Sequence, residues 1–404
     1  MNQKLQEKLL VTLKLLALAR LGIFIPIPGI DHNTFYNNVQ QNSFVNFLNI
    51  FSGGGFSTIG VCALGIVPYI NSSIFMQFGV KIFPYLEKLQ EEEGESGRQK
   101  ITQLTRYLTF VWALIQSVAI TFWIRPYVFN WNFSFILDTI LALTAGSLII
   151  LWISDLITKD GIGNGVSLLI FQNIVAGIPK TIEQSIAGQS FVILAVKAVL
   201  IIVLFSLIIL MAIFIQEGTR RIKIVSIKQL GLSENISESS YLPLKLNNGN
   251  VMPIVFASAL MAIPPYFLKF INNTGFINLI NEIRQPLYII SYGILIVFFS
   301  YFYILLNLNP NDISKNLKKM GVSIVGVRPG KITVQYLLNK LTFIGAILLF
   351  FLAIIPYITG SVTKINMLKG LGVTSLMILV GVSIDFAKQI QTYLISQKYD
   401  EMTK

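Results

Sequence analysis

The chain has 404 residues, of which 54% are hydrophobic and only 12% are charged, and its mean hydropathy is +0.68. Soluble domains carry about a quarter charged residues, so this composition excludes an ordinary soluble protein and indicates a polytopic membrane protein. The single cysteine excludes a disulfide framework and cysteine-based metal sites. A net charge of +12 would suit a nucleic-acid-binding protein, but the placement of the charges along the chain argues otherwise.

Ten stretches come close to the roughly 20 mostly apolar residues that a bilayer span needs. The expected spans lie at about 9–29, 62–83, 106–124, 135–157, 164–182, 190–216, 252–270, 287–307, 340–359 and 366–387. With the N-terminus inside, most of the 31 lysines and arginines fall on inside segments, and Arg20 is counted among them. This bias supports the expected orientation and explains the basic charge without nucleic acid.

The spans divide evenly into two sets of five, and an odd number of spans gives the two sets opposite orientations. We therefore expect an all-α polytopic membrane protein with ten transmembrane helices in two inverted five-helix halves around a central pore. Residues 1–186 would hold spans 1–5, and residues 187–404 would hold spans 6–10, two long inside loops and the C-terminal tail. Inverted halves enclose a central site at their interface, although no sequence repeat supports the symmetry.

The stretch at 51–77, FSGGGFSTIGVCALGIVPYINSSIFMQ, is uncharged but too rich in Gly, Ser and Asn for a lipid-facing helix. Three glycines at 53–55 disfavour helix, and Pro68 interrupts the helical pattern that follows. Broken backbone survives in a membrane only where protein or a water-filled cavity surrounds it. The stretch is therefore predicted to form a movable plug, at about 51–60, and part of a pore wall. Its Gly and Ser content should make displacement easy.

Chemistry-bearing residues are scarce within the spans. Asp138 and Asp155 fall near span ends, and Asp385 lies three residues before Lys388. No carboxylate and histidine chain, phosphate-binding loop, nucleophile elbow or HExxH motif is present, so the sequence predicts neither an enzyme nor a cofactor or metal. Instead, apolar pairs recur at helical spacing beside the Gly-rich breaks, as at Ile66 and Ile70. Ordinary helix packing is the alternative explanation for such pairs.

Ordered sequence blocks then point to a family. They are IPIPGID (25–31), FSGGG (51–55), ALGIVPYI (63–70), EGESGR (93–98), TRY (105–107), GIGNGVSLLIF (161–171), LPLK (242–245), FAS (256–258), QPLY (285–288), NLKKMG (316–321), VRPG (327–330), TSLMI (374–378) and DFAKQIQT (385–392). Over nearly its whole length the chain closely resembles the SecY family, whose members form the central subunit of bacterial and plastid protein-conducting channels.

The resemblance implies an hourglass pore closed by a ring of aliphatic side chains, which would be Ile66, Ile70, Val166, Ile170, Val255 and Ile378. It implies that the plug comprises Phe51, Ser52, Gly53, Gly54, Gly55, Phe56, Ser57, Thr58 and Ile59. A lateral gate between spans 2 and 7 would include Asn71, Ser72 and Ile263. Arg220, Arg221 and Arg328 would lie on partner-docking loops, and the rigid Arg328-Pro329-Gly330 turn independently suits contact with an acidic or phosphate-bearing partner.

The implied partners are a SecE-type small membrane subunit, the SecA motor ATPase or the ribosome, and unfolded preproteins with signal sequences; a SecG-type subunit is left open. The loop at 225–241 lacks a second basic cluster that many members carry, which weakens the ribosome assignment. A short N-terminus and tail and frequent Ile, Asn, Lys and Phe favour a plastid-encoded, thylakoid-membrane member over a bacterial plasma-membrane one. By physics alone, a secondary transporter with inverted repeats is the main alternative, and a scaffold subunit is the third.

Overall fold

The computed structural model describes residues 3–39, 52–92, 94–186, 191–226, 241–247, 249, 251–261, 274–307, 310–324, 331–363 and 366–402. The chain divides into two compact units, one comprising Met1–Ser185 with Val382–Lys404 and the other Ile186–Gly381. The last helix, α16 (Asn366–Met402), contributes residues to both. The two inverted halves expected from the span count remain a prediction.

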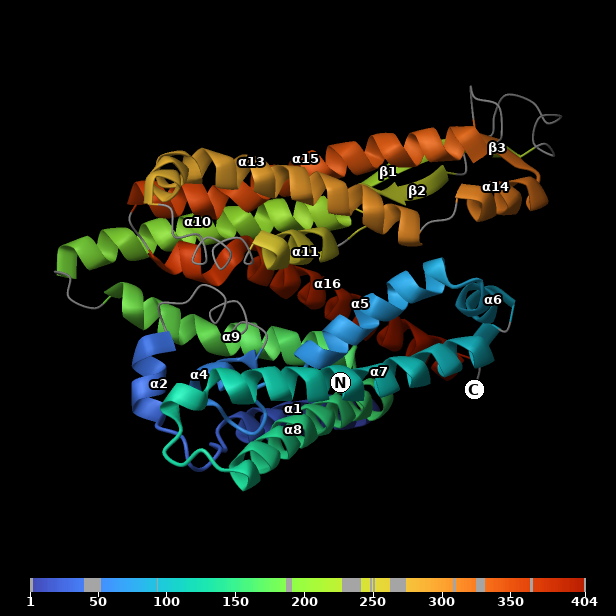
Figure 1. The fold of residues 1–404 in the computed structure, drawn as a ribbon. Coiled ribbons are helices and arrows are strands. Elements are labelled where there is room, and N and C mark those ends of the chain that lie inside the picture. Colours follow the sequence, from blue (N-terminus) through green and yellow to red (C-terminus); the bar gives the residue numbers. More distant parts are fainter. Residues whose placement is uncertain are drawn as a thin grey trace. The chain divides into compact units, whose positions relative to one another are not determined.

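The first unit is helical (Figure 1). Its elements are α1 (Gln3–Ile23), α2 (His32–Val39), α4 (Gly55–Thr58), α5 (Val67–Ile82), α6 (Pro84–Glu92), α7 (Gly94–Trp123), the 3-10 helix η1 (Arg125–Tyr127), α8 (Phe133–Asp160) and α9 (Gly165–Ile186).

The second unit combines helices with a small sheet. Before the last helix it contains α10 (Phe191–Glu217), β1 (Thr219–Ser226), β2 (Tyr241–Lys245), α11 (Met252–Met261), α13 (Thr274–Asn307), α14 (Pro310–Lys319), β3 (Val322–Ile324) and α15 (Lys331–Thr363).

Each expected span overlaps a helix, but several ends differ. The first helix ends at Ile23 rather than near residue 29, because the prolines of the IPIPG segment disfavour helix. The helix of the second span begins at Val67 with Pro68 in its first turn, a favoured position for proline. Within the described residues, Gly94–Trp123, Phe133–Asp160 and Ile332–Ile355 are long and apolar enough to cross a membrane, and shorter apolar helices occur at Gly165–Pro179, Ile202–Glu217 and Ile289–Leu305.

Small residues four apart let α7 pack closely against its neighbours. The buried positions on this face are Thr105, Thr109, Ala113, Ser117 and Thr121. Thr109 shares a hydrogen bond of 2.6 Å with Ser72 of α5, and Ser117 shares one of 2.9 Å with Thr144 of α8. Such small and hydroxyl-bearing interfaces are a common way to join helices in a bilayer. Figure 1 shows α7 lying beside both helices.

A three-stranded antiparallel sheet of order β2-β1-β3 adds to the helices of the second unit. Ile222, Ile224 and Leu244 of the sheet pack against an apolar cluster from α13, α14 and α15 that contains Ile304 and Leu317. The third strand, β3, covers Val322–Ile324, and residues 325–330, which include the Arg328-Pro329-Gly330 turn, lie outside the described residues.

Candidate functional site

The described part of the plug segment, 52–59, is packed into the first unit. Phe56 and Ile59 are 5% and 2% exposed and join an apolar cluster with Ile27, Phe35 and Leu143. The ring of Phe56 also lies 5.7 Å from that of Trp123 at the end of α7. Burying an aliphatic or aromatic side chain contributes about 1.5–3 kcal/mol, so the segment is held more firmly than its Gly and Ser content suggests. Phe51 lies outside the described residues.

Backbone bonds tie the end of this segment to the IPIPG stretch. The Ile27 amide donates to the Ile59 carbonyl at 3.1 Å, and the Val61 amide donates to the Ile25 carbonyl at 2.8 Å. A side-chain contact holds the other end, because Arg20 Nη1 of α1 donates to the Gly53 carbonyl at 2.7 Å. Arg20 lies in the last turn of α1, at the opposite end of the helix from the N-terminal lysines with which it was counted.

Four of the six expected ring residues lie in one apolar cluster of the first unit. Ile66, at the N-terminus of α5, is 1% exposed, and Ile70, Val166 and Ile170 are partly buried against the same cluster. The cluster also includes Ala19 and Ile23 of α1, together with side chains of α8 and α9. The Gly-rich breaks before α5 and α9 therefore bring apolar pairs from two separate stretches into a single patch.

The loop before α9 is docked on α1 and α8. The Ile162 amide donates to Thr12 Oγ1 of α1 at 3.0 Å, and the Gly165 amide donates to Thr158 Oγ1 of α8 at 2.8 Å. The Asn164 side chain caps α9, since its Oδ1 accepts from the Val166 amide at 3.1 Å. These bonds set where α9 begins and thus where Val166 and Ile170 are presented.

The other two expected ring residues belong to the second unit. Val255 is partly buried on α11, and Ile378 is buried on α16. Beside Ile378, the Gln216 side chain of α10 donates from Nε2 to the Met377 carbonyl at 3.0 Å, which fixes this part of α16 against α10. Convergence of all six residues on one axis stays a prediction.

The expected lateral-gate residues have different surroundings. Asn71 is partly buried on α5, whereas Ser72 is fully buried and bonded to Thr109 of α7. Ser72 therefore strengthens the interface between α5 and α7 inside the first unit, and its place in a lateral gate stays a prediction. Ile263 lies outside the described residues.

An exposed basic surface forms on the sheet of the second unit. Arg220 and Arg221 are exposed on β1, and the Arg221 guanidinium lies 4.9 Å from the centre of the Tyr241 ring on β2. Lys223 and Lys245 are also exposed on these strands. A guanidinium held against an aromatic ring keeps hydrogen-bond donors available for an anionic partner. Arg328, the third expected docking residue, lies outside the described residues.

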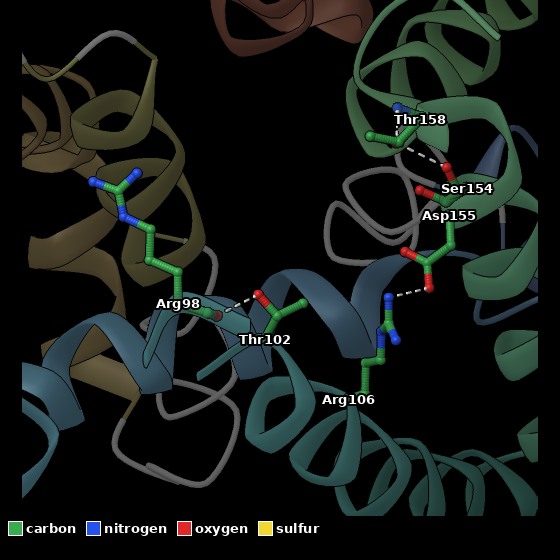
Figure 2. Close-up of polar contacts among 7 residues, drawn as sticks. Arg98, Thr102, Arg106, Ser154, Asp155 and Thr158 are labelled. Carbon is green, nitrogen blue, oxygen red and sulfur yellow. Dashed lines mark hydrogen bonds and ion pairs between the residues drawn. The ribbon is translucent and has the colours of Figure 1, made fainter. Parts of the chain in front are cut away.

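Figure 2 shows a polar link between α7 and α8, in which the Arg106 guanidinium faces the Asp155 carboxylate at 2.9 Å. The same view shows hydroxyls bonded to carbonyls of their own helices, from Thr102 to Arg98 and from Thr158 to Ser154, both at 2.9 Å. The sequence places Asp155 near a span end and Arg106 in the TRY block but does not predict that the two residues pair. Opposite charges at the ends of consecutive predicted spans would have been the signal.

Comparison with solved structures identifies the fold. A chain described as a protein-conducting channel matches with a TM-score of 0.61 and 18% identity, covering 98% of this chain and 94% of that one. A SecY structure whose plug domain is described as stabilising the closed channel and maintaining a membrane seal matches at 0.60. Sec61 from a canine ribosome–channel complex matches at 0.58. The chain therefore has the fold of these channel structures, which agrees with the expected ten-span all-α architecture.

Sequence comparison supplies the family. The SecY family profile matches residues 60–387. A protein translocase subunit SecY from Porphyra purpurea is 60% identical over 411 residues, covering all of both chains. Another from Synechocystis is 51% identical, covering 99% of this chain and 94% of its own. The chain therefore belongs to the SecY family, and as a translocase channel subunit it is a transport protein rather than an enzyme.

Proposed function

We propose that this chain forms the polypeptide-conducting pore of a Sec translocase, closed by Ile66, Ile70, Val166, Ile170, Val255 and Ile378 and by a plug at 51–59. The observation that carries the proposal is the packing of Ile66, Ile70, Val166 and Ile170 in one apolar cluster beside a seated Gly-rich segment. Neither feature serves a transporter that holds its substrate with paired charges at the membrane midplane.

An aliphatic constriction suits this task for two reasons. An ion entering it loses hydration and gains no polar partner, so small solutes meet a high barrier. Aliphatic side chains also have no preferred polar partner, so they can spread around an unfolded chain of any sequence. The plug at 52–59 supplies a second seal, anchored by Phe56, Ile59 and the Gly53 carbonyl.

Release into lipid would occur between α5 and α11, at a lateral gate that includes Asn71 and Ile263. Ser72 would contribute by holding α5 to α7, so that α5 moves with its neighbour. A signal sequence of roughly 10–15 apolar residues could drive opening by entering lipid, at about 0.8 kcal/mol per buried CH₂.

The proposed partners are a SecE-type subunit, with a SecG-type subunit left open, and the SecA motor or the ribosome docked on the basic loops. Arg220 and Arg221 present exposed charge there, and Arg328 would extend this surface. Preproteins with signal sequences are the proposed substrates. The plastid and cyanobacterial origin of the similar chains supports a multi-pass location in the plastid thylakoid membrane.

The test is single-channel recording on the reconstituted full translocase. Deleting residues 51–59 should make the closed channel open in brief bursts, and Ile170→Asn should raise ion leak and admit weak signal sequences, because a polar side chain hydrates the constriction. Val175→Asn is the matched control, since Val175 is exposed on the same helix, α9. Both ring and control variants are first checked for assembly with the small subunit.

Two results would contradict the proposal. A plug-deleted protein that never conducts would favour a transporter. Equal leak and equal signal selection in the Ile170→Asn and Val175→Asn proteins would remove Ile170 from the constriction.

A further inference from the structure

Arg20 is an ionisable side chain on a helix that is expected to span the membrane. Such residues are rare in bilayers because exposing a charge to hydrocarbon is unfavourable, so each one calls for a partner and a role. No ion pair between Arg20 and a carboxylate is seen among the described residues. Its guanidinium instead lies 5.1 Å from the centre of the Phe24 ring and donates to the Gly53 carbonyl at 2.7 Å.

The contact requires glycine at position 53, because of its backbone conformation and because neighbouring side chains approach it closely. Its φ of +63° is one that side chains disfavour. A Cβ atom built on Gly53 would lie 2.5 Å from Asn173 Oδ1 and 2.7 Å from Arg20 Nη1. The neighbouring Gly54 also has a positive φ, of +88°, but a Cβ atom there would meet nothing within 4 Å. Of these two glycines, therefore, only Gly53 is closely approached by side chains of α1 and α9.

The contact also touches the helix that carries two expected ring residues. Asn173 is 8% exposed on α9 and lies three residues after Ile170, about one helical turn. The adjacent Gln172 side chain donates from Nε2 to the Leu16 carbonyl of α1 at 2.9 Å. Arg20, the Gly53 carbonyl and Asn173 therefore join α1, the plug segment and α9 at one point.

From this geometry we infer that Arg20 is a latch that holds the plug seated through the Gly53 carbonyl. The inference rests on the proposed plug function and adds the residue that regulates it. The bond exists only while the segment is seated, so it stabilises the closed state and not the open one. Hydration of the guanidinium as a polypeptide enters would replace the carbonyl and free the segment.

Removing the latch should loosen the closed channel. In the reconstituted full translocase, Arg20→Leu should raise the spontaneous open probability roughly tenfold or more, because hydrogen bonds to charged groups are stronger than neutral ones. Lys14→Leu is the matched control: it removes one positive charge from the exposed face of the same helix, away from the plug. The measurement is single-channel recording at equal amounts of assembled complex.

A glycine pair tests the same contact without changing a charge. Gly53→Ala and Gly54→Ala impose similar strain at positive φ, but only Gly53→Ala forces the segment off Arg20 and Asn173. We expect frequent openings in Gly53→Ala and fewer in Gly54→Ala. This pair keeps the inference testable should Arg20→Leu fail to assemble.

A plug deletion separates the latch from the plug itself. If deleting residues 51–59 leaves the channel closed, the proposed plug function fails. If the deletion leaks while Arg20→Leu behaves like Lys14→Leu, or Gly53→Ala like Gly54→Ala, the plug stands and the latch is wrong. In the plug-deleted protein Arg20→Leu should add no further leak, and an added leak would show that Arg20 acts elsewhere.

Discussion

Two arginines of the first unit show how surroundings decide what a charge contributes. Arg106 and Asp155 form a direct ion pair, but their side chains are 49% and 42% exposed. Pairs with that exposure typically contribute about 0.2–1 kcal/mol. Arg20 is instead partly buried on a helix that is expected to span the membrane, and it donates to the Gly53 carbonyl at 2.7 Å. Its loss should therefore matter more than the loss of either partner of the exposed pair.

The sequence could indicate the type of these residues but not all of their partners. Four-residue spacing predicted that Ile66 and Ile70 share a helix face, and both join one cluster. Arg20 was assigned to the inside charges because a count by position takes no account of where a helix ends. The partner of Arg20 lies 33 residues away in a glycine run with no side chain to suggest a contact.

Reversing the charge of Arg221 should impair docking of the proposed motor or ribosome on the sheet of the second unit. Arg221→Glu removes the guanidinium from Tyr241 and repels an anionic partner, so we expect motor-driven translocation to fall at least roughly tenfold. The assay is preprotein import into vesicles carrying the assembled complex. Lys159→Glu, an equal charge change at an exposed position of α8, should import normally. Normal import by Arg221→Glu would exclude Arg221 from docking.

Helices were predicted better than the junctions between them. Every expected span overlaps a helix because long apolar runs are a strong signal. The three-stranded sheet was missed because β1 pairs with strands from other stretches of chain, and pairing over such separations leaves little local trace. The plug was expected to be easily displaced because its composition, unlike its packing, is visible in the sequence.

The start of α9 packs closely against α8 at Gly165. A methyl group on Gly165 would collide with the Ser154 carbonyl of α8, whereas one on Gly177 of the same helix would meet nothing within 4 Å. Gly165→Ala should therefore separate α9 from α8 and cost about 1–3 kcal/mol of stability. Gly177→Ala should be neutral or stabilising by up to about 1 kcal/mol. Thermal unfolding of the purified complex measures both, and equal midpoints would contradict the close packing of α8 and α9.

For the whole molecule, the span count and the ordered motifs were sufficient to predict the fold class and the family, both of which the comparisons establish. Whether the six ring residues converge on one axis depends on how the two compact units meet. Sequence spacing relates residues within one helix and carries no such information. The six-residue ring therefore rests on a property that only a measurement across the units can test.

Cross-linking supplies that measurement. The only cysteine, Cys62, is buried and can be replaced by alanine. In that background, Ile170→Cys and Ile378→Cys should be joined by a short bis-maleimide in the closed channel, because both are expected at the constriction. Val175→Cys with Ile378→Cys is the control pair and should react poorly. Equal cross-linking yields from the two pairs would mean that residue 170 is no closer to residue 378 than the control residue 175 is. That result would contradict the six-residue ring.

The bond from Arg20 to Gly53 has a consequence for biogenesis. Arg20, Gly53 and Asn173 all precede residue 186, as do the apolar residues that bury Phe56 and Ile59. Chains emerge from the ribosome N-terminus first and fold unit by unit. The plug can thus be seated while the later helices are still being translated. The N-terminal unit of an incompletely synthesised subunit would then enter the membrane with its plug already in place.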